Sequence, residues 1–236
     1  MAWSGNSGGY IDTVANLGPN VAGQTIKLRF RMGSDSNTSG TGWRVDTIVA
    51  TRPSCAPVAQ SAFSRKMHAG VPFDAPLPLG GSLSTGTLGI EPRRGGGASF
   101  DQHQMIVNFA TPISLRNPST VTVTSGVGSV SSFSISGTQA IINLTGVADA
   151  QRLAVTMSTV DDGPNTGSVA IPMGVLLGDA NNSGRVDSGD LTKVRQNNLQ
   201  LPNTNNFQAD VNASGRIDSG DVTLVRQRNL TALPPP

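Results

Sequence analysis

The sequence predicts a mainly β protein that ends in a small helical module, and three observations support this fold class. Glycine and proline, at 28 and 15 of the 236 residues, interrupt helices too often for a helical bundle. Short stretches that alternate apolar and polar residues, as strands with one buried face do, recur through most of the chain. Only the C-terminal part places apolar residues at helical spacing, and there the chain repeats itself.

Composition excludes several kinds of partner and site. The formal net charge is +2 and no run of basic residues is longer than Arg93-Arg94, so we expect no binding to nucleic acid. No stretch approaches the ~20 apolar residues of a membrane-spanning helix. Cys55 is the only cysteine, which excludes an intrachain disulfide, and we interpret it as an inert thiol.

Residues 1–51 are predicted to form three strands, Gly9–Leu17, Thr25–Met32 and Trp43–Thr51. Three strands with one apolar face cannot close a sandwich, so this segment either pairs with something else or is the remnant of a larger domain. We favour the remnant. The runs WSGNSGGYIDT, TIKLRFRMGSD and SGTGWRVDTIVA resemble the last strands of the jelly-roll modules of secreted bacterial exoproteins. This resemblance implies an extracellular setting and no activity.

Residues 52–63 are predicted to be a linker, and residues 64–177 a β-sandwich of immunoglobulin type. Seven or so short strands with turn signals between them are typical of such a Greek-key sandwich. The glycine-rich run GIEPRRGGGAS is expected to be a loop. The expected strands lie around Met67–Phe73, Gln104–Phe109, Thr120–Thr124, Ser131–Ile135, Ala140–Leu144, Arg152–Met157 and Ser168–Leu177.

The remaining residues, 178–236, form what we call the repeat region. GDANNSGRVDSGDLTKVRQNNL aligns with ADVNASGRIDSGDVTLVRQRNL at an offset of 31 residues, and 15 of those 22 positions are identical. A match of this extent does not arise by chance, so the two segments are expected to fold alike.

Each copy contains a loop of the form D-x-N-x-S-G-x-x-D-x-x-D, which matches the EF-hand calcium loop except that Asp replaces Glu at the twelfth place. Calcium takes about six to eight oxygen ligands, so a loop that binds it must present oxygens at alternate residues while the chain curls around the ion. We expect two calcium ions. The expected ligands in the first copy are Asp179, Asn181, Ser183, the Arg185 carbonyl, Asp187 (directly or through water) and Asp190; in the second they are Asp210, Asn212, Ser214, the Arg216 carbonyl, Asp218 and Asp221.

A helix is expected after each loop, through LTKVRQNNLQ and VTLVRQRNLT. Leu199 and Leu230 are expected on the apolar faces of these helices. Ser188 and Ser219 are placed to cap them. The eighth-place residues Val186 and Ile217 are expected to point into the core, where the two loops can pair as a short β-bridge.

A doubled calcium loop in which each copy has only its exiting helix resembles the type I dockerin module over residues 178–231. The resemblance implies calcium-dependent binding to a cohesin module by a nearly two-fold symmetric surface, so that a partner could dock on either copy. The alternative is that the module locks onto its own neighbouring sandwich. The recognition positions carried over from the family are Ser188, Gly189, Arg195 and Gln196, repeated as Ser219, Gly220, Arg226 and Gln227.

We therefore expect a monomeric, non-catalytic region of a secreted or cell-surface bacterial protein whose signal peptide is lost with a missing N-terminus. The alternative is an accessory region of an extracellular peptidase or glycosidase whose catalytic domain lies upstream. Gly5-Asn6-Ser7-Gly8-Gly9 fits the G-x-S-x-G pattern, but only four residues precede it, so we expect a turn. His68 and His103 are expected to be structural or exposed.

Overall fold

A computed structural model describes residues 8–15, 17, 21, 25–31, 37, 44–49, 56–79, 83, 88–98 and 100–236 of the chain. The chain divides into two compact units, Met1–Pro53 and Ser54–Pro236. The Gly5–Ser7 part of the G-x-S-x-G pattern and Cys55 lie outside the described residues.

The first unit contains no β-strand within residues 10–15, 25–31 and 44–49, so the three strands predicted there are not formed over these described positions. Their apolar side chains are exposed, with Ile11 at 60% and Leu28 at 50%. None of the described residues of this unit is buried, so these residues form no core. The rest of the predicted strands lies outside the described residues, and the jelly-roll expectation stays a prediction.

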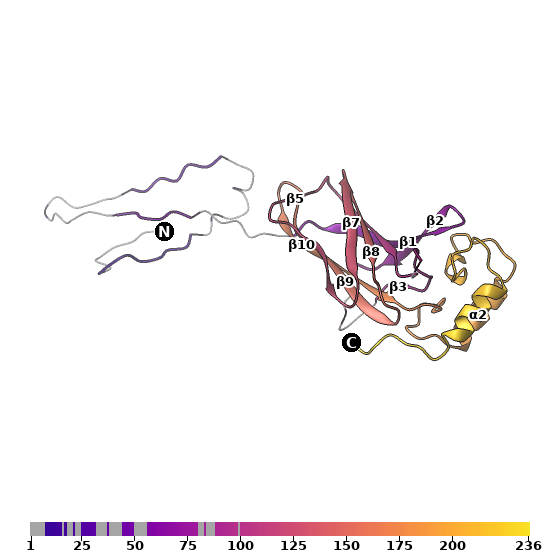
Figure 1. Cartoon of the computed structure of the whole chain (residues 1–236). Helices are drawn as coiled ribbons and strands as arrows, with labels where there is room; N and C mark the ends of the chain where they lie inside the picture. Colours follow the sequence, from indigo (N-terminus) through magenta and orange to yellow (C-terminus); the bar gives the residue numbers. More distant parts are fainter. Residues whose placement is uncertain are drawn as a thin grey trace. The chain divides into compact units, whose positions relative to one another are not determined.

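The second unit is a two-sheet β-structure followed by the repeat region, which confirms the predicted fold class (Figure 1). One sheet has the strand order β2-β1-β4-β8-β7; the other has β3-β10-β9-β5, and β6 also pairs with β9. The strands are β1 (Ala59–His68), β2 (Val71–Leu77), β3 (Ile90–Glu91), β4 (His103–Phe109), β5 (Ser114–Leu115), β6 (Val121–Ser125), β7 (Ser129–Ser136), β8 (Gln139–Thr145), β9 (Gln151–Asp161) and β10 (Thr166–Val175).

The core between the sheets is built by alternation along the strands. Ala140, Ile142 and Leu144 point inward from β8, and Val155 and Met157 do so from β9; all five are buried. Their outward neighbours on β8 are only partly buried. Six of the predicted strand segments coincide with β4, β6, β7, β8, β9 and β10.

The start of the sandwich differs from the sequence prediction. The predicted strand Met67–Phe73 spans a hairpin turn at Ala69 and Gly70, whose φ angles of 49° and 92° suit a two-residue turn between β1 and β2. In addition, β1 begins at Ala59, so residues 59–63 belong to the sheet rather than to the predicted linker. The sequence signal was weak because the inward face of β1 carries polar side chains, among them the buried Ser64 and Lys66.

The repeat region contains two α-helices, α1 (Ser188–Gln196) and α2 (Ser219–Gln227), and a short 3-10 helix, η2 (Phe207–Ala209). Its apolar side chains form a second core together with the end of the sandwich. Figure 1 shows the repeat region, in yellow, at the end of the sandwich where β2 lies. This second core includes Ile90 and Leu176 from the sandwich side and Val186, Val194, Val211, Ile217 and Val225 from the repeat region.

Two expectations about the helices are wrong. The helix N-caps are Asp187 and Asp218, one residue before the expected Ser188 and Ser219, because each aspartate forms a capping box with the carboxylate three residues later. The helices also end earlier than expected, at Gln196 and Gln227. Leu199 and Leu230 therefore lie beyond them and are 67% and 71% exposed.

The pairing of the eighth-place residues also differs from the expectation. Val186 and Ile217 are fully buried, as predicted, but they do not bridge to each other. The Val186 amide donates to the Thr231 carbonyl (2.9 Å), and the Ile217 amide donates to the Gln200 carbonyl (3.0 Å). Each loop thus pairs with the segment after the other copy's helix, which interlocks the two copies.

Candidate metal centre and docking face

The first loop is closed by two buried carboxylates. Asp179 accepts hydrogen bonds from the amides of Ser183 and Gly184, both at 2.8 Å. Asp190 accepts from the amides of Asn181 (3.0 Å) and Asp187 (2.9 Å). The side chains at the first and twelfth places, Asp179 and Asp190, therefore hold the backbone of the loop from its two ends.

The second loop repeats this arrangement. Asp210 accepts from the amides of Ser214 (2.9 Å) and Gly215 (2.8 Å). Asp221 accepts from the amides of Asn212 (3.0 Å) and Asp218 (2.9 Å). The two copies therefore have the same internal hydrogen bonds at closely similar distances.

Further oxygens meet inside each loop. The Ser183 hydroxyl donates to the Arg185 carbonyl at 2.8 Å, and the Ser214 hydroxyl donates to the Arg216 carbonyl at 3.0 Å. The Asn181 side-chain oxygen lies 3.0 Å from the Ser183 amide. In the described residues, no group of three His, Cys, Asp or Glu side chains forms a metal cluster. Any cation in these loops would therefore also need amide, hydroxyl and carbonyl oxygens, which are hard ligands of the kind that calcium prefers.

The loop carboxylates are buried, and the positive charge near them is too small to compensate their negative charge. Asp179, Asp190 and Asp221 are 0% exposed, and burial raises the pKa of all three, that of Asp221 to about 6. Among the salt bridges of the described residues, none includes any of these three side chains. Buried like charges are costly unless a cation compensates them, so the loops fit a hard divalent cation.

The aspartates at the ninth place of each loop are expected metal ligands, and they also act as helix N-caps. Asp187 caps α1 by accepting a hydrogen bond from the Gly189 amide at 2.7 Å, and Asp218 caps α2 through the Gly220 amide at the same distance. The loop pattern in the sequence predicts only a metal-binding role for these two residues. The structure places each of them at the junction between its loop and the helix that follows.

Residues 177–228 match the family model of the Dockerin type I domain. This match confirms the resemblance expected from the repeated loops. Type I dockerin domains are non-catalytic modules that bind calcium and cohesin. No curated protein and no solved structure matches the chain. None of the helices formed by the described residues is long and apolar enough to span a membrane.

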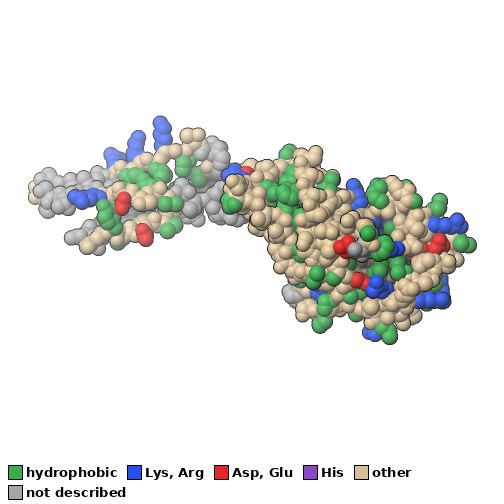
Figure 2. Space-filling model, viewed as in Figure 1, with side chains coloured by type: hydrophobic (Ala, Val, Ile, Leu, Met, Phe, Trp, Pro, Cys, Tyr) green, Lys and Arg blue, Asp and Glu red, His purple; other side chains and the backbone are tan. Residues whose placement is uncertain are grey.

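The positions carried over for partner recognition lie on the surface of the dockerin segment. All eight residues are exposed: Ser188, Gly189, Arg195, Gln196, Ser219, Gly220, Arg226 and Gln227. Figure 2 shows Lys and Arg side chains on the surface around the repeat region, where Arg195 and Arg226 are exposed.

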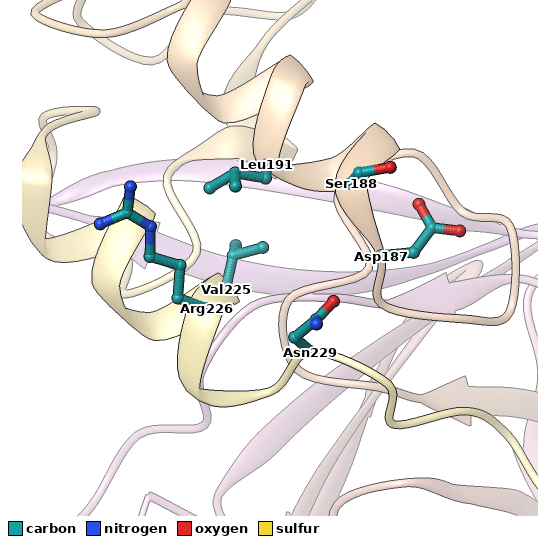
Figure 3. A pocket seen from close by; sticks show the side chains of 6 residues that line it. All are labelled: Asp187, Ser188, Leu191, Val225, Arg226 and Asn229. Atoms are coloured by element: carbon teal, nitrogen blue, oxygen red, sulfur yellow. The ribbon is translucent and has the colours of Figure 1, made fainter.

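A groove of about 180 Å³ joins the two copies on this surface (Figure 3). Its lining combines the start of α1 with the end of α2, so the helices run in opposite directions along it. Ser188 of the first copy and Arg226 of the second both line the groove. The sequence predicts one set of recognition residues within each copy. In the structure, residues of the two copies line the same groove. The full lining is Asp187, Ser188, Leu191, Val225, Arg226 and Asn229.

The second loop also contacts the sandwich, which the sequence analysis raised only as an alternative. The Arg94 amide donates to the Val211 carbonyl at 2.7 Å. The Phe207 ring stacks on Phe73 of β2, with centroids 5.6 Å apart and an interplanar angle of 9°. The Arg93 guanidinium lies 5.0 Å from the centre of the Phe207 ring. These residues are far apart in the sequence, so no local sequence pattern predicts the contact.

His68 of β1 is the site residue that sequence reasoning missed. Its Nδ1 lies 2.7 Å from Oδ2 of Asp210, the first-place carboxylate of the second loop. Two aspartates closer to the histidines in the sequence have other partners: Asp74 pairs with Arg65, and the Asp101 carboxylate accepts a hydrogen bond from the Gly146 amide. His68 and Asp210 are 142 residues apart in the sequence, so no local pattern predicts their contact.

Proposed function

We propose that the repeat region is a calcium-dependent docking module that anchors or assembles a secreted protein by binding a cohesin-type partner. One observation carries this proposal. Two nearly identical loops bury carboxylates that are held by equivalent amides, and three of these carboxylates, Asp179, Asp190 and Asp221, form no salt bridge with the described side chains. Calcium supplies the compensating positive charge and fixes the helices that start at the loops.

We assign two calcium ions to this region, one for each loop. The similar hydrogen bonds of the two loops support equal ligand sets. The proposed ligands are Asp179, Asn181, Ser183, the Arg185 carbonyl, Asp187 and Asp190 in the first loop, and Asp210, Asn212, Ser214, the Arg216 carbonyl, Asp218 and Asp221 in the second.

The proposed docking face consists of the eight exposed recognition positions and the groove between α1 and α2. A separate partner is favoured for this face because the contact with the sandwich uses other residues. The sandwich meets η2 and the back of the second loop through Phe73, Arg93 and Arg94, whereas the recognition positions remain exposed. Docking on the sandwich and binding to a cohesin-type partner are therefore compatible.

The proposal gives this region an anchoring role without catalysis, in a monomer at the cell surface or outside the cell. Dockerin modules belong to proteins of that setting. In the alternative proposal, the same module serves an extracellular hydrolase whose catalytic domain lies upstream of this region. Both versions require calcium binding by the two loops.

Calorimetric titration of the 236-residue chain with calcium tests the ligand assignment. We expect two sites in the wild type and one in each of the variants Asp190→Ala and Asp221→Ala, because each removes a twelfth-place carboxylate. Asp46→Ala, which alters an exposed aspartate of the first unit, is the control and should keep two sites. A wild-type chain that binds no calcium would overturn the proposal, and two sites in either loop variant would overturn the ligand set.

Partner recognition is tested by binding to a panel of immobilised cohesin modules with and without calcium. We expect calcium-dependent binding that survives the double substitution Arg195→Ala/Gln196→Ala or Arg226→Ala/Gln227→Ala. Binding should be lost when all four are combined, because both symmetric halves are then altered. Binding that requires no calcium and is unchanged in the variant with all four substitutions would refute the proposed docking face.

A further inference from the structure

We propose that the sandwich supplies a positioning residue to the second calcium loop: His68 of β1 holds the Asp210 carboxylate, so that calcium binding by this loop depends on the sandwich. The inference rests on the proposed function, because it requires the loop to bind calcium. It assigns a role to a residue outside the matched dockerin segment, which starts at residue 177.

The His68–Asp210 contact is short and removed from solvent. The Nδ1–Oδ2 distance is 2.7 Å and both side chains are 0% exposed. The same carboxylate accepts hydrogen bonds from the amides of Ser214 and Gly215. His68 thus adds a donor from a different part of the fold to the donors that the loop itself supplies to this carboxylate.

Arg93 fixes the orientation and the tautomer of the His68 ring. Its Nη1 lies 3.1 Å from Nε2 of His68, and a guanidinium can only donate. Nε2 is therefore the acceptor, and the ring hydrogen lies on Nδ1, where it is donated to Asp210.

The guanidinium of Arg93 is itself held in place by its other hydrogen bonds. Nε and Nη2 donate to the carboxylate of Glu91 at 2.7 and 2.8 Å. Nη1 also donates to the Phe73 carbonyl (2.9 Å), and Nη2 to the Ser64 carbonyl (2.9 Å). Arg93 is buried, so it cannot exchange these partners for water without opening the sandwich. A polar chain therefore runs from Glu91 through Arg93 and His68 to the calcium loop.

The first loop provides an internal comparison. Its first-place carboxylate, Asp179, accepts from the amides of Ser183 and Gly184, the counterparts of Ser214 and Gly215. No side chain of the described sandwich donates to Asp179 in the hydrogen bonds of this structure. The sandwich reaches this loop through backbone, where the Gly178 amide donates to the Pro92 carbonyl at 2.9 Å. The two loops therefore differ in one contact of the first-place carboxylate: His68 donates to Asp210, and no side chain of the described sandwich donates to Asp179.

Groups that orient a metal ligand commonly change metal affinity by about 10- to 100-fold when they are removed. His68 keeps the Asp210 oxygens in one direction before calcium arrives, so less order has to be created on binding. By thermodynamic linkage, calcium in the second loop in turn stabilises the contact between the loop and the sandwich.

The test measures calcium affinity loop by loop in the 236-residue chain. Asp190→Ala leaves only the second loop, and Asp221→Ala leaves only the first. In the Asp190→Ala background, we expect His68→Leu to weaken calcium binding about 10- to 100-fold, because leucine fills the space without donating a hydrogen bond. In the Asp221→Ala background, the same substitution should leave the affinity unchanged.

Two further variants keep the test falsifiable if leucine disturbs the fold. His68→Asn places an amide donor near the position of Nδ1 and should restore most of the affinity. His103→Leu alters the other buried histidine, which does not contact Asp210, and should leave the second loop unaffected. Equal weakening of both loops, or an unchanged second loop in His68→Leu, would overturn the inference and leave the proposed function standing. Absence of calcium binding in the parent variants would instead overturn the proposed function.

Discussion

The two loops of the repeat region have nearly the same sequence and the same internal hydrogen bonds, but they have different surroundings. In the first loop, the side chains of Asn181 and Ser183 are exposed to solvent. In the second loop, Asp210 meets His68, and Gly215 lies against Ala69. A repeated sequence therefore fixes the shape of a loop and leaves its support to whatever part of the fold packs beside it.

The difference matters because the sandwich and the repeat region share one core. Ile90 and Leu176 belong to the sandwich side and pack with Val186 and Ile217 from the two loops. Arg152 of β9 also donates to the carbonyl of Pro234, near the C-terminus. The docking module is thus stabilised from outside its own sequence, and the comparison of the two loops can be tested by altering that support.

The largest effect should come from acid, through a buried histidine of the sandwich. Burial lowers the pKa of His103 on β4 from 6.5 to about 3. Below pH 6.5 the unfolded chain takes up a proton that the folded chain refuses at His103 until about pH 3, so this side chain by itself should lower the free energy of unfolding by several kcal/mol as the pH falls across this window. The raised pKa of Asp221, about 6, acts in the opposite direction between pH 6 and 3.8, so the difference between the wild type and His103→Leu measures the contribution of His103. Chemical denaturation between pH 7 and 4.5 measures the slope.

His103→Leu is the matched control for the acid effect, because leucine cannot be protonated and should not show the loss of stability that His103 causes. Glu91, whose buried carboxyl has its pKa lowered to about 2 by Arg93, contributes only below its ordinary value of 4.5. An unchanged slope in His103→Leu would show that other groups cause the acid sensitivity.

The next effect concerns the aromatic contact that holds the second loop against β2. Phe207 is buried, stacks on Phe73 and lies under the Arg93 guanidinium. Phe207→Ala should lower the free energy of unfolding by about 3–5 kcal/mol, because it leaves a cavity at this contact. Phe133→Ala on β7, where the ring is 47% exposed, should cost much less in the same denaturation experiment. Equal losses in the two variants would contradict a specific role for the Phe207 contact.

The smallest effect gives the sharpest comparison of the two loops. Gly184 and Gly215 occupy the same loop place with φ angles of 82° and 88°, so alanine strains both backbones alike. A Cβ on Gly184 meets nothing within 4 Å, whereas one on Gly215 would lie 2.3 Å from Cβ of Ala69. Gly215→Ala should therefore destabilise the chain by about 1–3 kcal/mol more than Gly184→Ala, as measured by thermal or chemical denaturation. Equal losses would mean that the second loop does not need its close contact with the β1–β2 turn.

Much of this structure could be predicted from the sequence, where the signal is local. Alternation gave the positions of β8 and β9, because one face of each strand is apolar and buried. It failed at β1, because Ser64, Lys66 and His68 occupy the inward face of that strand. It also predicted strands in the first unit, where the described apolar residues find no second layer to pack against.

For the candidate site, the sequence by itself determined the doubled loop, because a cation loop needs oxygen-bearing residues at fixed intervals within a short segment. The places of Asp179, Asp190 and their counterparts follow from those intervals alone. The tertiary structure decided which loop the sandwich supports, how Ser188 and Arg226 of different copies come to line one groove, and that His68 belongs to the site. These are contacts between segments far apart in the chain, and no local pattern records them because they depend on how two separately folded surfaces pack.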